Sequence, residues 1–85
     1  MENQVKTAVD KLVKDKDLLE IAKYNYYCVD YDDLKDPDDD FLAALAKELN
    51  YSGDKMLSTF IEDGYVEINI DVDSDGNAYT DVYIY

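Results

Sequence analysis

The C-terminal stretch GYVEINIDVDSDGNAYTDVYIY, residues 64–85, decides the fold of this 85-residue chain. From Val66 to Asp73, aliphatic residues alternate with polar ones, which is the period of a half-buried β-strand. A second alternating run covers residues 79–85, and the sequence DGN at 75–77, between the runs, is typical of a tight turn. The stretch therefore predicts an antiparallel β-hairpin with one aliphatic face.

The register of this hairpin determines which side chains share a face. A two-residue loop at 75–76 would place Asp81 beside Ile70, a carboxylate among aliphatics. A three-residue loop at 75–77 keeps the aliphatic set together, pairing Val72 with Thr80, Ile70 with Val82, and Ile68 with Ile84. We expect this second register, with Gly76 or Asn77 in the left-handed conformation. It also places Asp71 directly opposite Asp81, and facing like charges on a sheet cost roughly 0.2–1 kcal/mol.

The region before the hairpin predicts helices. Residues 4–27 have apolar residues at helical spacing, but KDKD at 14–17 interrupts them, so the pattern fits either one long helix or two short ones. In the second case Asp17 and Glu20 resemble a capping box. Residues 26–29 either finish this helix or form a short edge strand beside the hairpin.

Two further helical segments are expected downstream. One of the acids at 38–40 should cap a helix with apolar residues between 41 and 49 and a stop at Asn50, and a third segment should run from Ser52 to Gly64. The order predicts a single α+β domain over residues 1–85. In it, two to four N-terminal helices pack on one face of a C-terminal antiparallel β-hairpin, or of a small sheet with a third edge strand.

The charge of the chain is strongly negative and unevenly distributed. It has 21 acids against 8 basic residues, a net charge of −13, and every basic residue is Lys. Residues 1–25 contain five Lys and five acids, so the remaining residues carry the whole excess. Such a field attracts basic protein surfaces and opposes direct binding to nucleic acid or to anionic membranes.

The residue types also disfavour catalysis and cofactor binding. The chain has no His, and its single Cys28 has no base to activate it, so we expect neither an enzyme nor a cofactor. Asp71, Asp73 and Asp75, followed by Gly76, match the first half of a calcium loop, but Val82 stands where the bidentate Glu is needed. They are a weak calcium candidate, and an acidic hairpin turn is the favoured interpretation.

Localisation follows from what the chain does not contain. No apolar run reaches the roughly 18 residues of a membrane span, and the first residues do not form a signal core. A lone Cys also disfavours a disulfide-stapled secreted scaffold. We therefore expect a cytoplasmic protein with no membrane partner.

The predicted binding surface joins two acidic regions. On a strand, alternate residues stand about 6.7 Å apart and neighbouring strands about 4.8 Å, so carboxylates on the outer hairpin face form a fixed array of negative charge. Such an array can imitate a nucleic-acid backbone, and Tyr adds contact area at low entropy cost. The alternative interpretation, without a binding function, is that the acids prevent aggregation through the sheet edge and the Tyr rings shield the sheet from water. The expected partner-binding residues are Glu67, Asn69, Asp71, Asp73, Tyr79, Asp81, Tyr83 and Tyr85 on the hairpin, with Asp30, Asp32, Asp33, Asp36, Asp38 and Asp39 in the acidic loop.

With these acidic runs at 30–40 and 67–85, the chain resembles a type of small acidic α+β protein. Phage-encoded inhibitors of host defence share this profile, in particular anti-CRISPR proteins and other DNA mimics. The resemblance is one of general type and carries over no individual residue. It implies a non-enzymatic inhibitor, acting in the cytoplasm of a bacterial host, that occupies the basic DNA- or guide-binding channel of a nuclease complex. The alternatives are an immunity protein against a basic nuclease toxin and a calcium-binding or purely structural module.

Overall fold

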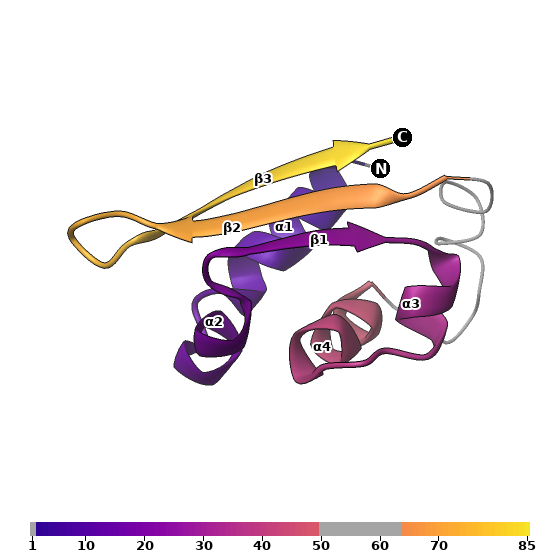
Figure 1. Ribbon diagram of the computed structural model, residues 1–85, viewed down its shortest axis with the longest axis horizontal. Coiled ribbons are helices and arrows are strands. Elements are labelled where there is room, and N and C mark those ends of the chain that lie inside the picture. Colours follow the sequence, from indigo (N-terminus) through magenta and orange to yellow (C-terminus); the bar gives the residue numbers. More distant parts are fainter. Residues whose placement is uncertain (1, 50–63) are drawn as a thin grey trace.

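The computed structural model describes residues 2–49 and 64–85 (Figure 1). Their elements in chain order are α1 (Glu2–Leu12), α2 (Lys16–Ala22), β1 (Asn25–Val29), α3 (Tyr31–Lys35), α4 (Asp40–Glu48), β2 (Val66–Val72) and β3 (Ala78–Ile84). The described strands form one antiparallel sheet in the order β1-β2-β3, and the helices lie together on one of its faces. The predicted α+β fold, with a third edge strand added to the hairpin, is confirmed.

The interruption at residues 14–17 separates two helices. Asp15 caps α2, because its Oδ1 accepts hydrogen bonds from the backbone N–H groups of Asp17 (2.9 Å) and Leu18 (3.2 Å). The alternative of two short helices is therefore correct, while the capping box at Asp17 and Glu20 is wrong by two positions. The helix expected from Ser52 up to its end at Gly64, and the stop at residue 50, fall on residues 50–63, which lie outside the described residues.

Strand β1 follows α2 after a sharp turn at Tyr24, which takes the left-handed conformation with φ of 60°. The sequence NYYCV then alternates in burial. Tyr27 and Val29 point into the core, and Tyr26 and Cys28 are exposed on the other side. Tyr27 stacks on Phe41 of α4, with ring centroids 5.3 Å apart. The edge-strand alternative for residues 26–29 is thus confirmed.

The hairpin keeps its predicted faces but has a different register. The observed pairs are Val66 with Ile84, Ile68 with Val82, Ile70 with Thr80, and Val72 with Ala78. This register is shifted by two residues, which leaves every side chain on its predicted face. It also means that Asp71 lies opposite Tyr79 and Asp81 opposite Asn69. The prediction that Asp71 lies directly opposite Asp81 is therefore wrong.

The side chain of Asp73 accounts for the shift. Its Oδ1 accepts hydrogen bonds from the backbone N–H groups of Asp75 and Asn77, both at 2.9 Å. The N–H of Asp73 also donates to the Asn77 carbonyl (3.0 Å), which leaves residues 74–76 as the loop. Gly76 supplies the left-handed residue with φ of 83°, as predicted. A loop over 75–77 would lose these contacts.

The core lies between the inner face of the sheet and the helices. Ile68 and Ile70 of the central strand are fully buried, as are Phe41 and Val9 from the helical layer. Helix α1 packs against β3, and α4 contacts the other three helices. The aliphatic and anionic side chains of the hairpin therefore lie on opposite faces, as the alternation predicts.

A polar contact joins α1 to β3 at the margin of this core. The Lys6 ammonium lies 2.9 Å from both carboxylate oxygens of Asp10 and donates to Thr80 Oγ1 at 2.8 Å, and the Thr80 hydroxyl donates to Asp10. Burial acts to raise the pKa of Asp10, but the hydrogen bond from Thr80 and the ion pair with Lys6 outweigh it, so the pKa is lowered from 3.8. The carboxylate therefore stabilises the folded state.

We predict that Asp10→Asn destabilises the protein by about 1 kcal/mol at neutral pH, a hydrogen-bond energy discounted for the partial exposure of the pair. Because the folded-state pKa is lowered, this stabilisation is fully present above pH 3.8 and is lost as the pH falls through the lowered value. Urea unfolding of both proteins across this range measures it. A constant difference between the two proteins down to acid pH would contradict the assignment.

Candidate functional site

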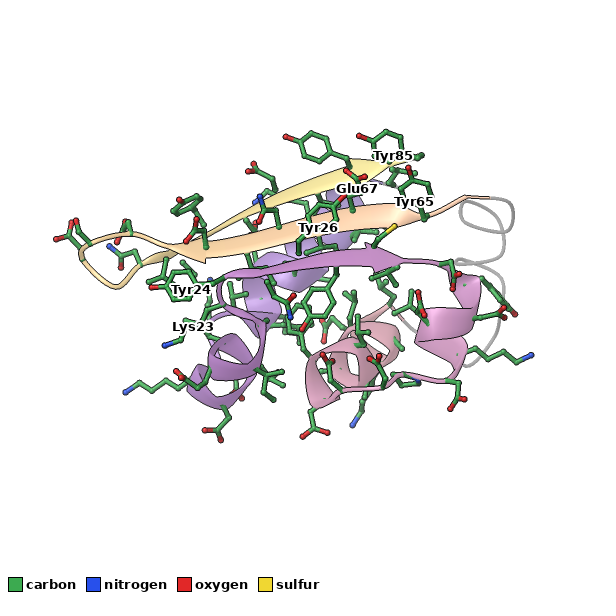
Figure 2. All side chains as sticks on the ribbon, viewed as in Figure 1. Lys23, Tyr24, Tyr26, Tyr65, Glu67 and Tyr85 are labelled. Carbon is green, nitrogen blue, oxygen red and sulfur yellow. The ribbon has the colours of Figure 1, made fainter. Side chains whose placement is uncertain are left out.

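The outer face of the sheet, opposite the helices, is the candidate site. Its side chains come from all three strands and the residues next to them: Tyr26 and Cys28 from β1, Tyr65, Glu67, Asn69 and Asp71 along β2, and Tyr79, Asp81, Tyr83 and Tyr85 along β3. Figure 2 shows Tyr26, Tyr65, Glu67 and Tyr85 projecting from this side. We call this set the outer face.

Large aromatic side chains dominate the outer face. Tyr26, Tyr79, Tyr83 and Tyr85 are each more than half exposed, between 51 and 60%. Each acid of β2 has a Tyr directly across on β3, because Glu67 pairs with Tyr83 and Asp71 with Tyr79. None of the three strands contains Lys. The outer face is therefore an alternating arrangement of phenols and carboxylates without internal cations.

The carboxylates affect the ionisation of these phenols. Interaction of the Tyr26 hydroxyl with Glu67, chiefly hydrogen bonding, raises the pKa of Tyr26 to about 12. Hydrogen bonding with Asp71 raises the pKa of Tyr79 in the same way, and the charge of Glu67 raises the pKa of Tyr85. These phenols keep their protons well above neutral pH, and the negative charge of the face stays on its carboxylates.

A pair of stacked Tyr rings lies at one end of the outer face. Tyr65 and Tyr85 exchange backbone hydrogen bonds of 3.2 and 2.9 Å, and their ring centroids lie 5.1 Å apart with an interplanar angle of 20°. Gly64 permits this approach, because a Cβ there would lie 2.0 Å from the Tyr85 carbonyl oxygen. The two rings stand at the same end of the sheet as Glu67 (Figure 2).

The acidic run at 30–40 is partly structural: α3 occupies residues 31–35, where a loop is predicted, while one of the acids at 38–40 caps the next helix, as predicted. Asp30 and Asp33 form a reciprocal capping box at the start of α3. Asp39 caps α4 through the Leu42 N–H (2.7 Å) and accepts a hydrogen bond from the Tyr27 hydroxyl (2.9 Å). These acids therefore hold the fold together. Asp32 in the first turn of α3, and Asp36 and Asp38 after it, have exposed side chains.

The calcium candidate is not assembled as a metal site. The Asp73 carboxylate bonds to the backbone of the turn, and Asp71 Oδ1 accepts the N–H of Val72 at 2.8 Å. In the part of the chain that the structure describes, no three carboxylate, thiol or imidazole groups come together as metal ligands. Asp73 is therefore a turn residue just beyond the end of β2, and its charge, like that of Asp71, raises the pKa of Tyr79.

Sequence reasoning missed the contribution of β1 to the site. Tyr26 interacts with Glu67, yet it precedes that residue by about forty positions in the chain. The signal was present in the run NYYCV, where Tyr26 and Cys28 alternate with the inward Tyr27 and Val29. The run is too short to distinguish a strand from a helix end by periodicity.

Comparison with protein-family models, with curated proteins and with solved structures finds no match. Within residues 2–49 and 64–85 no helix is long and apolar enough to cross a membrane.

We predict that Asp39→Ala lowers the free energy of unfolding by about 2 kcal/mol, because it removes a helix cap and takes away the carboxylate that accepts the Tyr27 hydroxyl proton. The neighbouring change Asp38→Ala alters the net charge equally and should cost less than about 0.5 kcal/mol. Urea unfolding of the two variants measures the difference. Equal stabilities would show that Asp39 is not a structural acid.

We predict that Glu67→Gln lowers the pKa of Tyr26 from about 12 towards 10.0, because the anionic neighbour that opposes ionisation is removed. Asp71→Asn is the matched control. It should lower the pKa of Tyr79 and leave that of Tyr26 unchanged. Ring resonances followed by NMR from neutral to alkaline pH give both values. An unchanged Tyr26 titration in Glu67→Gln would contradict the geometry.

Proposed function

We propose that this protein is a non-enzymatic inhibitor that binds a basic, nucleic-acid-binding surface of another protein through its outer face. The observation that carries the proposal is the sheet surface itself, where exposed Tyr rings alternate with carboxylates on strands that contain no Lys. Tyr is enriched among the residues that dominate interface energies, and its ring accepts a Lys or Arg side chain. Basic grooves present these cations.

The overall charge of the chain supports the same partner. A net charge of −13 raises the encounter rate with a cationic surface and repels nucleic acid, so the chain would compete with nucleic acid for a basic channel. The charge and the small α+β fold resemble, in general type, those of phage anti-CRISPR proteins and other DNA mimics. We therefore propose the DNA- or guide-binding channel of a CRISPR effector nuclease as the target, inside a bacterial host.

The structure favours the outer face over the acidic loop as the contact surface. Asp30, Asp33 and Asp39 are already engaged as helix caps, whereas Asp81 is exposed and is the one charged side chain of β3. A carboxylate bonded to backbone N–H groups has fewer free lone pairs for a partner cation. We propose that the loop acids contribute mainly to the long-range field.

The test compares two charge reversals of equal size. Asp71→Lys with Asp81→Lys changes the outer face, and Asp32→Lys with Asp38→Lys changes exposed acids on the helical side. Each Asp→Lys change adds two charges, so both variants go from −13 to −9. We expect the outer-face variant to lose at least tenfold in affinity for the partner and the control to lose much less.

The partner is first captured from a bacterial lysate at low salt and eluted with a salt gradient. Inhibition of its nuclease activity is then measured with the wild-type chain and both variants, after circular dichroism has shown that they fold. Equal inhibition by wild type and outer-face variant would remove the sheet from the site. A loss confined to the control would make the acidic loop the anchor instead.

A further inference from the structure

We infer that Glu67 and the Tyr rings around it receive an arginine side chain of the basic partner, and that this contact anchors the complex. The inference rests on the proposed function and specifies its central contact. Glu67 sits in the middle strand, opposite Cys28 on β1 and Tyr83 on β3. Tyr26 interacts with its carboxylate, and the stacked pair Tyr65 and Tyr85 stands beside it (Figure 2).

None of the ion pairs among the described residues involves Glu67. Their Lys–carboxylate pairs join Lys6 to Asp10, Lys11 to Glu48, and Lys23 to Glu20, which all belong to helices or their ends. Glu67 is only partly exposed, and within residues 2–49 and 64–85 it interacts with Tyr26 and Tyr85 of the outer face. A carboxylate that is partly shielded from water and surrounded by aromatic rings is complementary to a cation that can also stack.

A guanidinium fits this arrangement better than an ammonium. It is planar, it can donate two parallel hydrogen bonds to a carboxylate, and it is weakly hydrated, so it stacks readily on aromatic rings. The Tyr65 and Tyr85 rings lie within 20° of parallel and offer a planar aromatic surface next to Glu67. The compact ammonium of Lys retains its hydration and makes neither the paired hydrogen bonds nor the stacking contact.

The remaining acids of the outer face lack this combination. Asp71 interacts with Tyr79 and has its Oδ1 bonded to the Val72 N–H, and Asp81 faces Asn69 across the strands. Among the residues that the structure describes, the stacked Tyr pair of the outer face is Tyr65 with Tyr85, at the Glu67 end. The geometry therefore selects one end of the sheet for the arginine and leaves the other end to general electrostatic attraction.

The experiment titrates hexaarginine and hexalysine peptides into the isotope-labelled full-length chain at low salt and follows the Tyr ring and Glu carboxyl resonances by NMR. We expect hexaarginine to shift Glu67, Tyr26, Tyr65 and Tyr85 and to bind about fivefold more tightly than hexalysine. In Glu67→Gln, hexaarginine should bind about tenfold more weakly. Asp32→Asn removes the same charge from the helical side and should change the affinity by less than about twofold.

A second variant separates the role of the ring from that of the charge. Tyr85→Leu keeps Glu67 and an apolar side chain but removes an exposed aromatic surface, so the preference for hexaarginine over hexalysine should fall to about one. Retention of the fivefold preference in this variant would show that the stacked rings do not contact the guanidinium.

The outcomes distinguish this inference from the proposed function. Equal affinity of wild type for the two peptides, or Glu67→Gln behaving like Asp32→Asn, would overturn the arginine anchor. The proposed function would survive if the reversal of Asp71 and Asp81 still abolished binding. Peptide binding that moves no Tyr of the outer face would overturn both proposals.

Discussion

The burial of one side of strand β2 is the constraint on which the rest of the structure depends. Ile68 and Ile70 are fully buried between β1 and β3, so their parity is fixed by the apolar area that they remove from water. Glu67, Asn69 and Asp71, which alternate with them, must then point outward, and a slip by one position would bury Glu67 and Asn69. Tyr26 pairs with Asn69 and Tyr83 pairs with Glu67 across the strands, so both Tyr side chains must also point outward. The outer face is therefore rigid because the inner face is buried.

Two groups of acids in the described residues have different structural roles. Asp15, Asp30, Asp39 and Asp73 accept backbone N–H groups at helix starts or in the hairpin turn, where a carboxylate satisfies donors that the helix or turn leaves unpaired. On the outer face, Glu67 and Asp71 interact with phenols, and Asp71 also accepts the Val72 N–H. Composition does not distinguish the two groups. The acidic run at 30–40 therefore looks like a binding site in the sequence, although three of its acids cap helices.

The fold class and the division of the faces could be predicted because they depend on periodicity, which is a property of the sequence itself. The register could not, because it depends on one side chain. The Asp73 carboxylate accepts hydrogen bonds from the N–H groups of Asp75 and Asn77, which places the loop at residues 74–76 instead of 75–77. A register predicted by matching aliphatic residues across the strands does not take such local hydrogen bonds into account. The N-cap of α2 was predicted at the wrong residue for a related reason. Asp15 and Asp17 are chemically alike, and only the backbone conformation determines that Asp15 is the cap. The pairing of Tyr26 with Glu67 required knowledge of β1 as a strand.

The spacing of the outer-face charges limits what electrostatics alone contributes to the proposed complex. Glu67 and Asp71 stand four residues apart on one strand, about 13 Å at the usual rise, whereas duplex DNA carries a charge every 1.7 Å or so. Short-range imitation of a phosphate backbone is therefore sparse on this sheet. The net charge of −13 still acts over a Debye length of about 10 Å at 0.1 M salt, so it speeds encounter. In the proposed complex the exposed Tyr rings would supply most of the contact area, and affinity differences within one interface are set mainly by the dissociation rate. In such a complex the acids govern association and the Tyr rings govern lifetime.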